Sequence, residues 1–219
     1  MFIFPSPTGQ TIQELKPVFR LFYGVAEGYH IDVMDGKFVP NKMGSLDVIN
    51  ELHEYTDNQL WIHLMVQDPQ EYIEHLSVAQ DTIISFHYEA VELDQAEHIA
   101  NIIRAQNMRP SLAINPQTPL SGPLCLAHAF DHFLVMGVEP GSSGQPFIQK
   151  TVERVRELAL YQRNHSSHLS ISLDGGINRD TIAPFKLMNV DHIAVTSGIF
   201  NAPDPLDAFH ELQKKPELI

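Results

Sequence analysis

The stretch HIDVMDG at residues 30–36 decides how this chain folds and where its chemistry lies. Its first residues belong to an apolar run that we interpret as a buried β-strand. On a strand, His30 and Asp32 are two positions apart and therefore point to the same face. An unpaired carboxylate in a buried strand is costly, so we expect Asp32 to have a partner or a metal ion. The Asp35-Gly36 pair that follows is typical of a turn.

Three later segments carry side chains of the same chemical types. They are HLM at residues 63–65, VM at residues 135–136 and DGG at residues 174–176. Residues so far apart in the chain can form one site only if a fold gathers them. His30, Asp32, His63 and Asp174 would then offer a set of nitrogen and oxygen ligands that suits zinc, iron or manganese.

Apolar runs of the β type alternate with amphipathic helical patterns along the chain. We expect strands at residues 2–5, 29–33, 60–66, 82–87, 111–115, 132–138, 169–173 and 192–196. We expect helices at residues 12–22, 46–53, 69–76, 93–106, 148–161, 180–187 and 204–213, with a short one inside residues 117–128. Eight such pairs predict the α/β class and a single (β/α)8 TIM barrel domain over residues 1–219. An open doubly wound sheet shares the alternation but would spread the polar strand ends apart, whereas a barrel brings them to one mouth.

Composition excludes several classes of partner. The formal net charge is −13, which argues against nucleic acid. No apolar run approaches the length of a membrane span, and the first residues lack a signal-peptide pattern, so we expect a cytoplasmic protein that does not bind membranes. The single cysteine, Cys125, excludes an intramolecular disulfide, and we expect it to be a small buried apolar residue. An acidic chain can still bind phosphate through backbone N–H groups.

Five motifs together resemble the ribulose-phosphate 3-epimerase family. They are HIDVMDGKFVPN (residues 30–41), HLMV (63–66), INPQTP (114–119), VMGVEPGSSGQPF (135–147) and LDGGI (173–177). The resemblance extends from about residue 2 to residue 200. It implies a TIM barrel and an enzyme, an isomerase of the pentose phosphate pathway that interconverts D-ribulose 5-phosphate and D-xylulose 5-phosphate.

The resemblance also implies roles for single residues. His30, Asp32, His63 and Asp174 would bind one divalent metal ion, with zinc as the first choice and iron, manganese or cobalt as alternatives. Asp32 and Asp174 would also be the catalytic pair, because epimerisation needs one group on each face of the carbon to remove and return a proton. The substrate, a small phosphorylated ketose, would contact Ser6, Met34, Met65, Met136, Gly141, Gly144, Gly175, Gly176, Ser197 and Gly198. Family members form homo-oligomers, so we expect one here.

Most other histidines are expected to have no part in the site. His53, His75, His98 and His210 fall in helical stretches, and His165 and His168 fall in a polar stretch that we interpret as a solvated loop. His87 and Glu89 match the end of a strand in the family, where they would contribute shape or hydrogen bonds behind the ligands.

The chain departs from the family pattern at substrate contacts. Ser142 and Ser143 replace a phenylalanine and a glycine in the sixth loop, and Thr196 replaces a glycine beside the expected phosphate site. A β-branched residue there would crowd the phosphate. These changes leave two alternatives open: an epimerase for another ketose phosphate, such as allulose 6-phosphate, and a non-catalytic protein that binds sugar phosphates.

Overall fold

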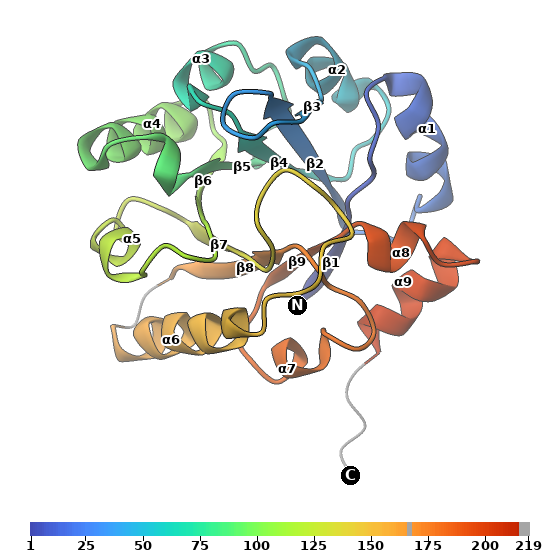
Figure 1. The fold of residues 1–219 in the computed structure, drawn as a ribbon. Helices are drawn as coiled ribbons and strands as arrows, with labels where there is room; N and C mark the ends of the chain where they lie inside the picture. Colours follow the sequence, from blue (N-terminus) through green and yellow to red (C-terminus); the bar gives the residue numbers. More distant parts are fainter. Residues whose placement is uncertain (166–167, 215–219) are drawn as a thin grey trace.

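Eight parallel strands form the centre of the molecule in the computed structural model, which describes residues 1–165 and 168–214. They are β1 (Phe2–Pro5), β2 (Gly28–Asp35), β4 (Gln59–Met65), β5 (Ile83–His87), β6 (Arg109–Ile114), β7 (His132–Met136), β8 (Ser170–Asp174) and β9 (His192–Val195). Their order in the sheet is β1-β9-β8-β7-β6-β5-β4-β2. Contacts between β1 and β2 close this curled sheet into a barrel, which Figure 1 shows from one end. The predicted TIM barrel is confirmed, and the open sheet is ruled out.

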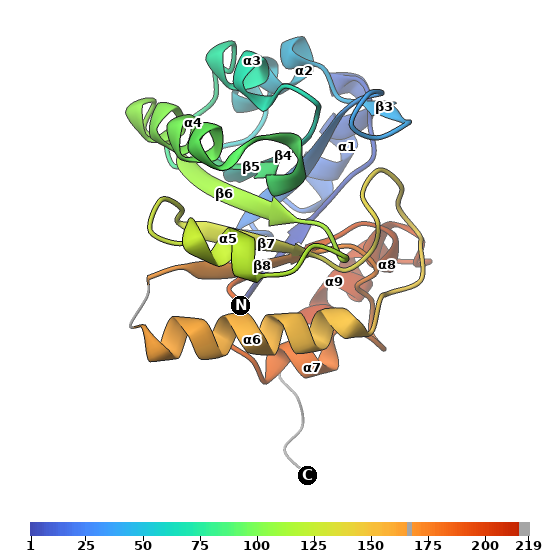
Figure 2. The same cartoon turned by 60° about the vertical axis from the view of Figure 1, so that its left-hand side comes forward.

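Helices surround the barrel on the outside (Figures 1 and 2). They are α1 (Ile12–Leu21), α2 (Leu46–Glu51), α3 (Pro69–Glu74), α4 (Leu93–Ala105), α5 (Ser121–Cys125), α6 (Lys150–Asn164), α7 (Ala183–Lys186), α8 (Ser197–Phe200) and α9 (Pro205–Gln213), with 3₁₀ turns η1 (Leu52–Glu54) and η2 (Tyr88–Ala90). Local sequence sets their first turns: Thr11 and Glu14 form a reciprocal capping box at α1, and Asp204 caps α9. Within the described ranges, no helix combines the length and the apolar character that crossing a bilayer would need.

The strands read as continuous apolar runs because both of their faces are buried. Outward side chains such as Ile31, Ile62 and Phe133 pack against the helices in the large core. Inward side chains fill the barrel in a smaller cluster that includes Phe4, Trp61, Leu134, Met136 and Ala194. This alternation explains why polar residues two apart on β2 both enter the barrel.

The observed strands differ from the predicted ones by no more than two residues at either end. A short strand, β3 (Lys42–Met43), was not predicted; it pairs antiparallel with the end of β2 through Met34↔Met43. Two predictions are wrong. The polar stretch at residues 163–167, predicted as a loop, is helical through Asn164 and has His165 as the C-cap of α6; residues 166 and 167 lie outside the described residues. Cys125 is exposed instead of buried, because it ends the short helix α5 on the side that faces solvent.

Candidate active site

A cavity of about 350 Å³ opens where the strands end at their carboxyl termini. Its walls come from β2, β4, β7, β8 and β9 and from the loops that follow them. Among its lining residues are Asp32, Met34, Met65, Met136 and Asp174, five of the residues predicted for the site. The barrel therefore brings together side chains that are up to 142 positions apart (174 − 32) in the sequence.

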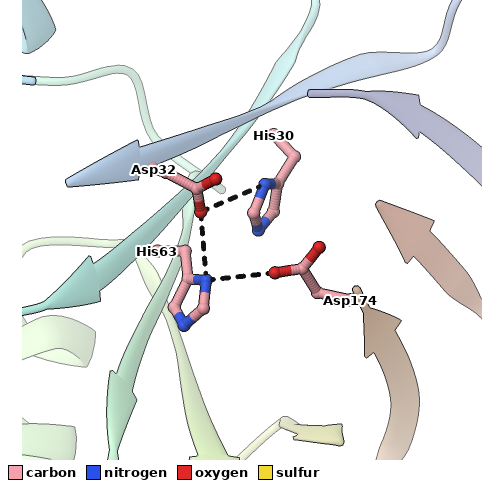
Figure 3. Close-up of side chains that lie close together, drawn as sticks. All are labelled: His30, Asp32, His63 and Asp174. Carbon is pink, nitrogen blue, oxygen red and sulfur yellow. Dashed lines mark hydrogen bonds and ion pairs between the residues drawn. The ribbon is translucent and has the colours of Figure 1, made fainter. Parts of the chain in front are cut away.

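Four side chains lie close together beneath this cavity, and two of them, Asp32 and Asp174, line it (Figure 3). His30 and Asp32 come from β2, His63 from β4 and Asp174 from the end of β8. Each offers one nitrogen or oxygen, and these four atoms all lie within 4.8 Å of one another. Asp32 is paired directly with His63 in the parallel register of β2 and β4. The predicted ligand set is thus gathered in one place.

The His63 ring lies between the two carboxylates. Its Nδ1 is 3.2 Å from Asp32 Oδ1 and 3.5 Å from Asp174 Oδ2, while His30 Nδ1 is 3.7 Å from Asp32 Oδ1. Burial alone would lower the pKa of His63, but hydrogen bonds to Asp174 and Asp32 outweigh burial and raise this pKa to about 9. The cluster therefore favours positive charge at the position where Figure 3 shows the side chains meeting.

The other two groups respond to the same neighbours. Burial lowers the pKa of His30, and the charges of Asp32 and Asp174 oppose this effect. Burial alone would raise the pKa of Asp174, but His30 and His63 hold it below its ordinary value. Neutral imidazole and ionised carboxylate are the forms that bind metal ions.

The donor set fits a divalent cation. His30 Nε2 is buried and has no hydrogen-bond partner in the part of the chain that the structure describes. A buried ring nitrogen without a partner is costly unless something binds it. Two imidazole nitrogens and two carboxylate oxygens from four residues match the ligands of zinc and related ions. The cluster could therefore hold a metal ion.

Both histidines are held from behind by buried polar groups. Ser6 Oγ lies 3.0 Å from His30 Nδ1, and Ser6 is fully buried. His63 Nε2 lies 2.9 Å from His87 Nε2, and His87 Nδ1 lies 3.4 Å from Glu89 Oε2. The sequence signal for both residues is their position at a strand end: His87 ends β5, which pairs with β4, and Glu89 follows it in η2.

Methionines form the apolar wall above the carboxylates. Met34 and Met65 pack with Val39 in a small cluster of their own, and Met136 faces the cavity from β7. Thioethers add no charge and exclude water, which strengthens electrostatic interactions inside the site.

Two glycines at the end of β8 allow the chain to turn beside the cavity. Gly175 and Gly176 have φ angles of +101° and +71°, and a Cβ at Gly176 would lie 2.9 Å from the Cα of Phe147. A side chain there would be strained and would push against backbone. Both glycines and Ser197 line the cavity, whereas Gly198 packs tightly against the carbonyl of Ile177.

The loop between β7 and α6 covers one side of the cavity. The Asn41 side chain donates hydrogen bonds to the Gly141 carbonyl (2.8 Å) and to Ser142 Oγ (3.1 Å). Gly141, Ser142, Ser143 and Gly144 all line the cavity, as does Thr196 from the other side. The residues that depart from the family pattern thus form part of the cavity wall. Asn41, Thr8 and Lys42 also line it and were not predicted, because none has a spacing that marks it in the sequence.

The remaining histidines divide into two groups. His53, His75, His98, His128, His165, His168 and His210 are exposed. His132 and His192, the first residues of β7 and β9, are buried at the opposite end of the barrel with ring centroids 5.1 Å apart. Burial lowers the pKa of His132 to about 2 and that of His192 to about 4. The sequence pattern did not distinguish these two from the others.

Comparisons with known proteins identify the family of the chain. The Ribulose-phosphate 3 epimerase family matches residues 10–200. The cytoplasmic isoform of ribulose-phosphate 3-epimerase from Oryza sativa subsp. japonica is 36% identical over 195 residues, which cover 88% of this chain and 83% of the rice protein. The Bacillus subtilis ribulose-phosphate 3-epimerase is 31% identical over 205 residues, covering 91% and 90% of the two chains.

Solved structures share the fold at much lower identity. The 3-hexulose-6-phosphate synthase of Salmonella typhimurium superposes with a TM-score of 0.69 at 13% identity, covering 97% of this chain and 96% of the other. The 3-keto-L-gulonate-6-phosphate decarboxylase of Vibrio cholerae gives 0.70 at 12% identity, covering 96% of each. These likenesses concern the fold alone, while the family match and the sequence relatives identify the family. This chain belongs to the ribulose-phosphate 3-epimerase family.

Proposed function

We propose that this protein is a metal-dependent isomerase that interconverts D-ribulose 5-phosphate and D-xylulose 5-phosphate, a step of the pentose phosphate pathway. The observation that carries the proposal is the placement of Asp32 and Asp174. They extend from β2 and β8 toward the same His63 nitrogen, at the floor of a cavity large enough for a small sugar phosphate. Family membership and the names of the curated relatives support the same reaction.

The two aspartates would act as an acid–base pair at C3. One carboxylate removes the C3 proton from one face of the substrate, and the other, as an acid, returns a proton to the opposite face. Which aspartate deprotonates depends on the direction of the reaction. Removal of the proton leaves an enediolate with negative charge on oxygen. A divalent cation held by His30, Asp32, His63 and Asp174 would supply Lewis-acid stabilisation of that charge.

The surroundings of the aspartates balance their two tasks. A nearby cation favours the ionised carboxylate and makes it a weaker base. The apolar wall of Met34, Met65 and Met136 lowers the local dielectric constant, which opposes this effect and keeps water away from the enediolate.

The remaining predicted substrate contacts are proposed on grounds of position and family resemblance. Backbone N–H groups of Gly175, Gly176, Ser197 and Gly198 would bind the phosphate, and Gly141 and Gly144 would belong to a loop that closes over the sugar. Ser6, buried behind His30, would contact the substrate only if that ring moved aside, so its observed bond to His30 favours an indirect role.

Zinc is the metal that we propose first, with iron, manganese or cobalt as alternatives. A ligand set of two imidazoles and two carboxylates does not distinguish strongly among them. Elemental analysis of purified protein, followed by chelation and reloading with each ion, identifies the metal that restores activity. We also propose a cytoplasmic homo-oligomer, and light scattering on a sizing column measures its mass.

The decisive experiment is turnover of D-ribulose 5-phosphate by metal-loaded protein, coupled to detection of D-xylulose 5-phosphate. Rapid, metal-dependent turnover is the expected result. Because Ser142, Ser143 and Thr196 lie in the cavity wall, allulose 6-phosphate and other six-carbon ketose phosphates belong in the same assay. A strong preference for one of these would replace the five-carbon substrate. Stabilisation by sugar phosphate without turnover of any would indicate a binding protein.

A further inference from the structure

A line of polar side chains leads from the buried His63 away from the cavity. His63 Nε2 and His87 Nε2 are 2.9 Å apart, and both residues are fully buried. The ring planes differ by 25° and the ring centroids are 5.0 Å apart, so the rings meet edge to edge, as a hydrogen bond requires. Beyond them, His87 Nδ1 lies 3.4 Å from Glu89 Oε2.

Once His63 binds a cation, the proton between the two rings can belong to only one of them. A ring nitrogen that binds a metal carries no proton. His63 Nδ1 faces Asp32 and Asp174, so a neutral His63 that binds through Nδ1 must carry its proton on Nε2. This N–H donates to His87 Nε2, which is then an acceptor. The proton of a neutral His87 must therefore sit on Nδ1, on the side of Glu89.

Glu89 is fixed so that it can only accept. Its Oε1 accepts hydrogen bonds from the Asn115 backbone N–H (2.9 Å) and from Thr118 Oγ1 (2.5 Å). The carbonyls of Asn115 and Thr118 in turn accept from the Arg154 guanidinium on α6, at 3.1 Å and 2.5 Å. Oε2 remains for the His87 ring: it lies 3.4 Å from Nδ1, and Nδ1 makes no well-aligned hydrogen bond to any group in the described residues, so a small approach of the two groups is needed to form one.

We propose that His87 and Glu89 are positioning residues that act through His63. Glu89 accepts the Nδ1 proton of His87, His87 accepts the Nε2 proton of His63, and this order leaves His63 Nδ1 unprotonated and aimed at the cation. The proposal rests on the proposed function, because it requires that His63 bind a metal. Ser6 holds His30 in a weaker way, because a hydroxyl can donate or accept and so does not select a tautomer.

Glu89→Gln separates this role from a merely structural one. The amide oxygen of glutamine can still accept from Asn115 and Thr118, so the local fold keeps its hydrogen bonds. The NH₂ group would then face His87 and donate to Nδ1, which moves the His87 proton to Nε2. Two N–H groups would meet between His87 and His63. We expect the affinity for Zn²⁺ to fall about 10- to 100-fold, as for other groups that orient metal-binding histidines.

The chain offers a matched control for this variant. Glu97 Oε1 lies 3.5 Å from His128 Nε2, nearly the same carboxylate–histidine distance, but both residues are exposed and lie outside the site. Glu97→Gln should leave Zn²⁺ affinity unchanged.

Two substitutions of His87 test the acceptor directly. His87→Phe keeps an aromatic ring against Phe38, whose ring centroid is 4.7 Å away, but removes the acceptor for His63. His87→Gln can restore an acceptor through its side-chain carbonyl. We expect Zn²⁺ affinity to fall about 10- to 100-fold in the phenylalanine variant and to recover at least partly in the glutamine variant.

Four measurements test the proposal. Competition with a chelating dye gives Zn²⁺ affinity, the visible spectrum of the Co²⁺-loaded protein reports the ligand geometry, and thermal unfolding of the metal-free variants checks that they fold. Long-range ¹H–¹⁵N NMR of the zinc-loaded natural protein reads the ring protons directly, and we expect Nε2–H on His63 and Nδ1–H on His87.

The results distinguish failure of this proposal from failure of the proposed metal site. A proton on His87 Nε2 in the zinc-loaded protein, or wild-type affinity in both Glu89→Gln and His87→Phe, would overturn the proposed role of His87 and Glu89 and leave the proposed enzyme intact. If the natural protein itself bound no divalent ion, the metal site would be wrong, and the role of His87 and Glu89 would be wrong with it.

Discussion

Asp174 shows how much one residue depends on its place in the fold. It ends β8, it is 8% exposed, and the two glycines that follow it turn the chain away at once. A carboxylate so buried is stable only because His30 and His63 lie beside it, and these neighbours hold its pKa below the ordinary value. The same neighbours keep it ionised and ready to accept a proton at neutral pH.

Asp174→Asn should reduce epimerase activity by a factor on the order of 10² to 10⁴, because an amide can neither accept nor return a proton at C3. The measurement is kcat/KM with D-ribulose 5-phosphate for protein loaded with metal. Asp180→Asn, an exposed residue in the loop after β8, is the control and should retain activity. Near-normal turnover by the Asp174 variant would contradict the two-aspartate mechanism.

The buried pair of His132 and His192 predicts a sensitivity to acid. Burial keeps both rings neutral in the folded protein, and the positive charge of Arg109 acts in the same direction on both. At His192, the N-terminal ammonium adds to this effect and Asp191 opposes it. In the unfolded chain both titrate near pH 6.5. As pH falls below 6.5, both histidines take up protons in the unfolded state but stay unprotonated in the folded state. The free energy of unfolding therefore falls by about 1.4 kcal/mol per pH unit for each histidine. His192 stops contributing below about pH 4.

Urea unfolding between pH 7.5 and 5 measures this loss of stability. The His192→Phe variant shows how much of the loss comes from His192. A phenylalanine keeps a ring against Phe2 and Phe4 and has no proton to gain. The difference between the two proteins in the free energy of unfolding should grow by on the order of 2 kcal/mol from pH 6.5 to pH 5. Parallel curves would show that His192 titrates alike in both states.

At the scale of elements, the loop between β7 and α6 is held by hydrogen bonds from outside and within it. Asn41, just before β3, donates two hydrogen bonds to it, and Gln145 donates to the carbonyls of Glu139 and Ser142 within the loop. Since this loop forms one wall of the cavity, the hydrogen bonds from Asn41 hold that wall against the barrel.

Asn41→Ala should raise KM for the sugar phosphate by up to about tenfold and change kcat less, because each lost hydrogen bond contributes about 1 kcal/mol to the closed wall. Amide hydrogen exchange at residues 141–145 should quicken in the same variant. Asn101→Ala, an exposed position on α4, serves as the control. Unchanged exchange in the loop would show that Asn41 does not hold it.

The elements also show what the sequence can and cannot predict. Continuous apolar runs located every barrel strand, because burial on both faces leaves a clear pattern. The two residues of β3 leave no pattern, and Cys125 was misplaced because a helix of five residues has too few turns to mark its buried face. The contact between His63 and His87 depends on the register of β4 against β5, which pairs His63 with Ser85, two residues before His87. The sequence of either strand alone does not determine this register.

At the scale of the whole molecule, the barrel joins the first strand to the last. β1 pairs with β9 along its length and contacts β2, so removing either end of the chain opens the ring. We propose that residues 1–219 form one domain, because the core runs continuously between the barrel and its helices.

This continuity predicts a single cooperative unfolding transition in denaturant. Far-ultraviolet and near-ultraviolet circular dichroism should give the same midpoint for metal-free protein, since helices and barrel core cannot unfold separately. Two separated midpoints would contradict the single domain.

Trp61 gives the molecule one more property. It is the only tryptophan of the chain. Its indole N–H donates to Ser85 Oγ at 2.7 Å, and its ring meets the ring of His30 edge-on with centroids 4.5 Å apart. Indole fluorescence responds to the electric field across the ring. A charge that binds at His30 therefore changes the wavelength and the intensity of Trp61 fluorescence. The protein thus carries its own optical reporter of the metal site, readable without any label.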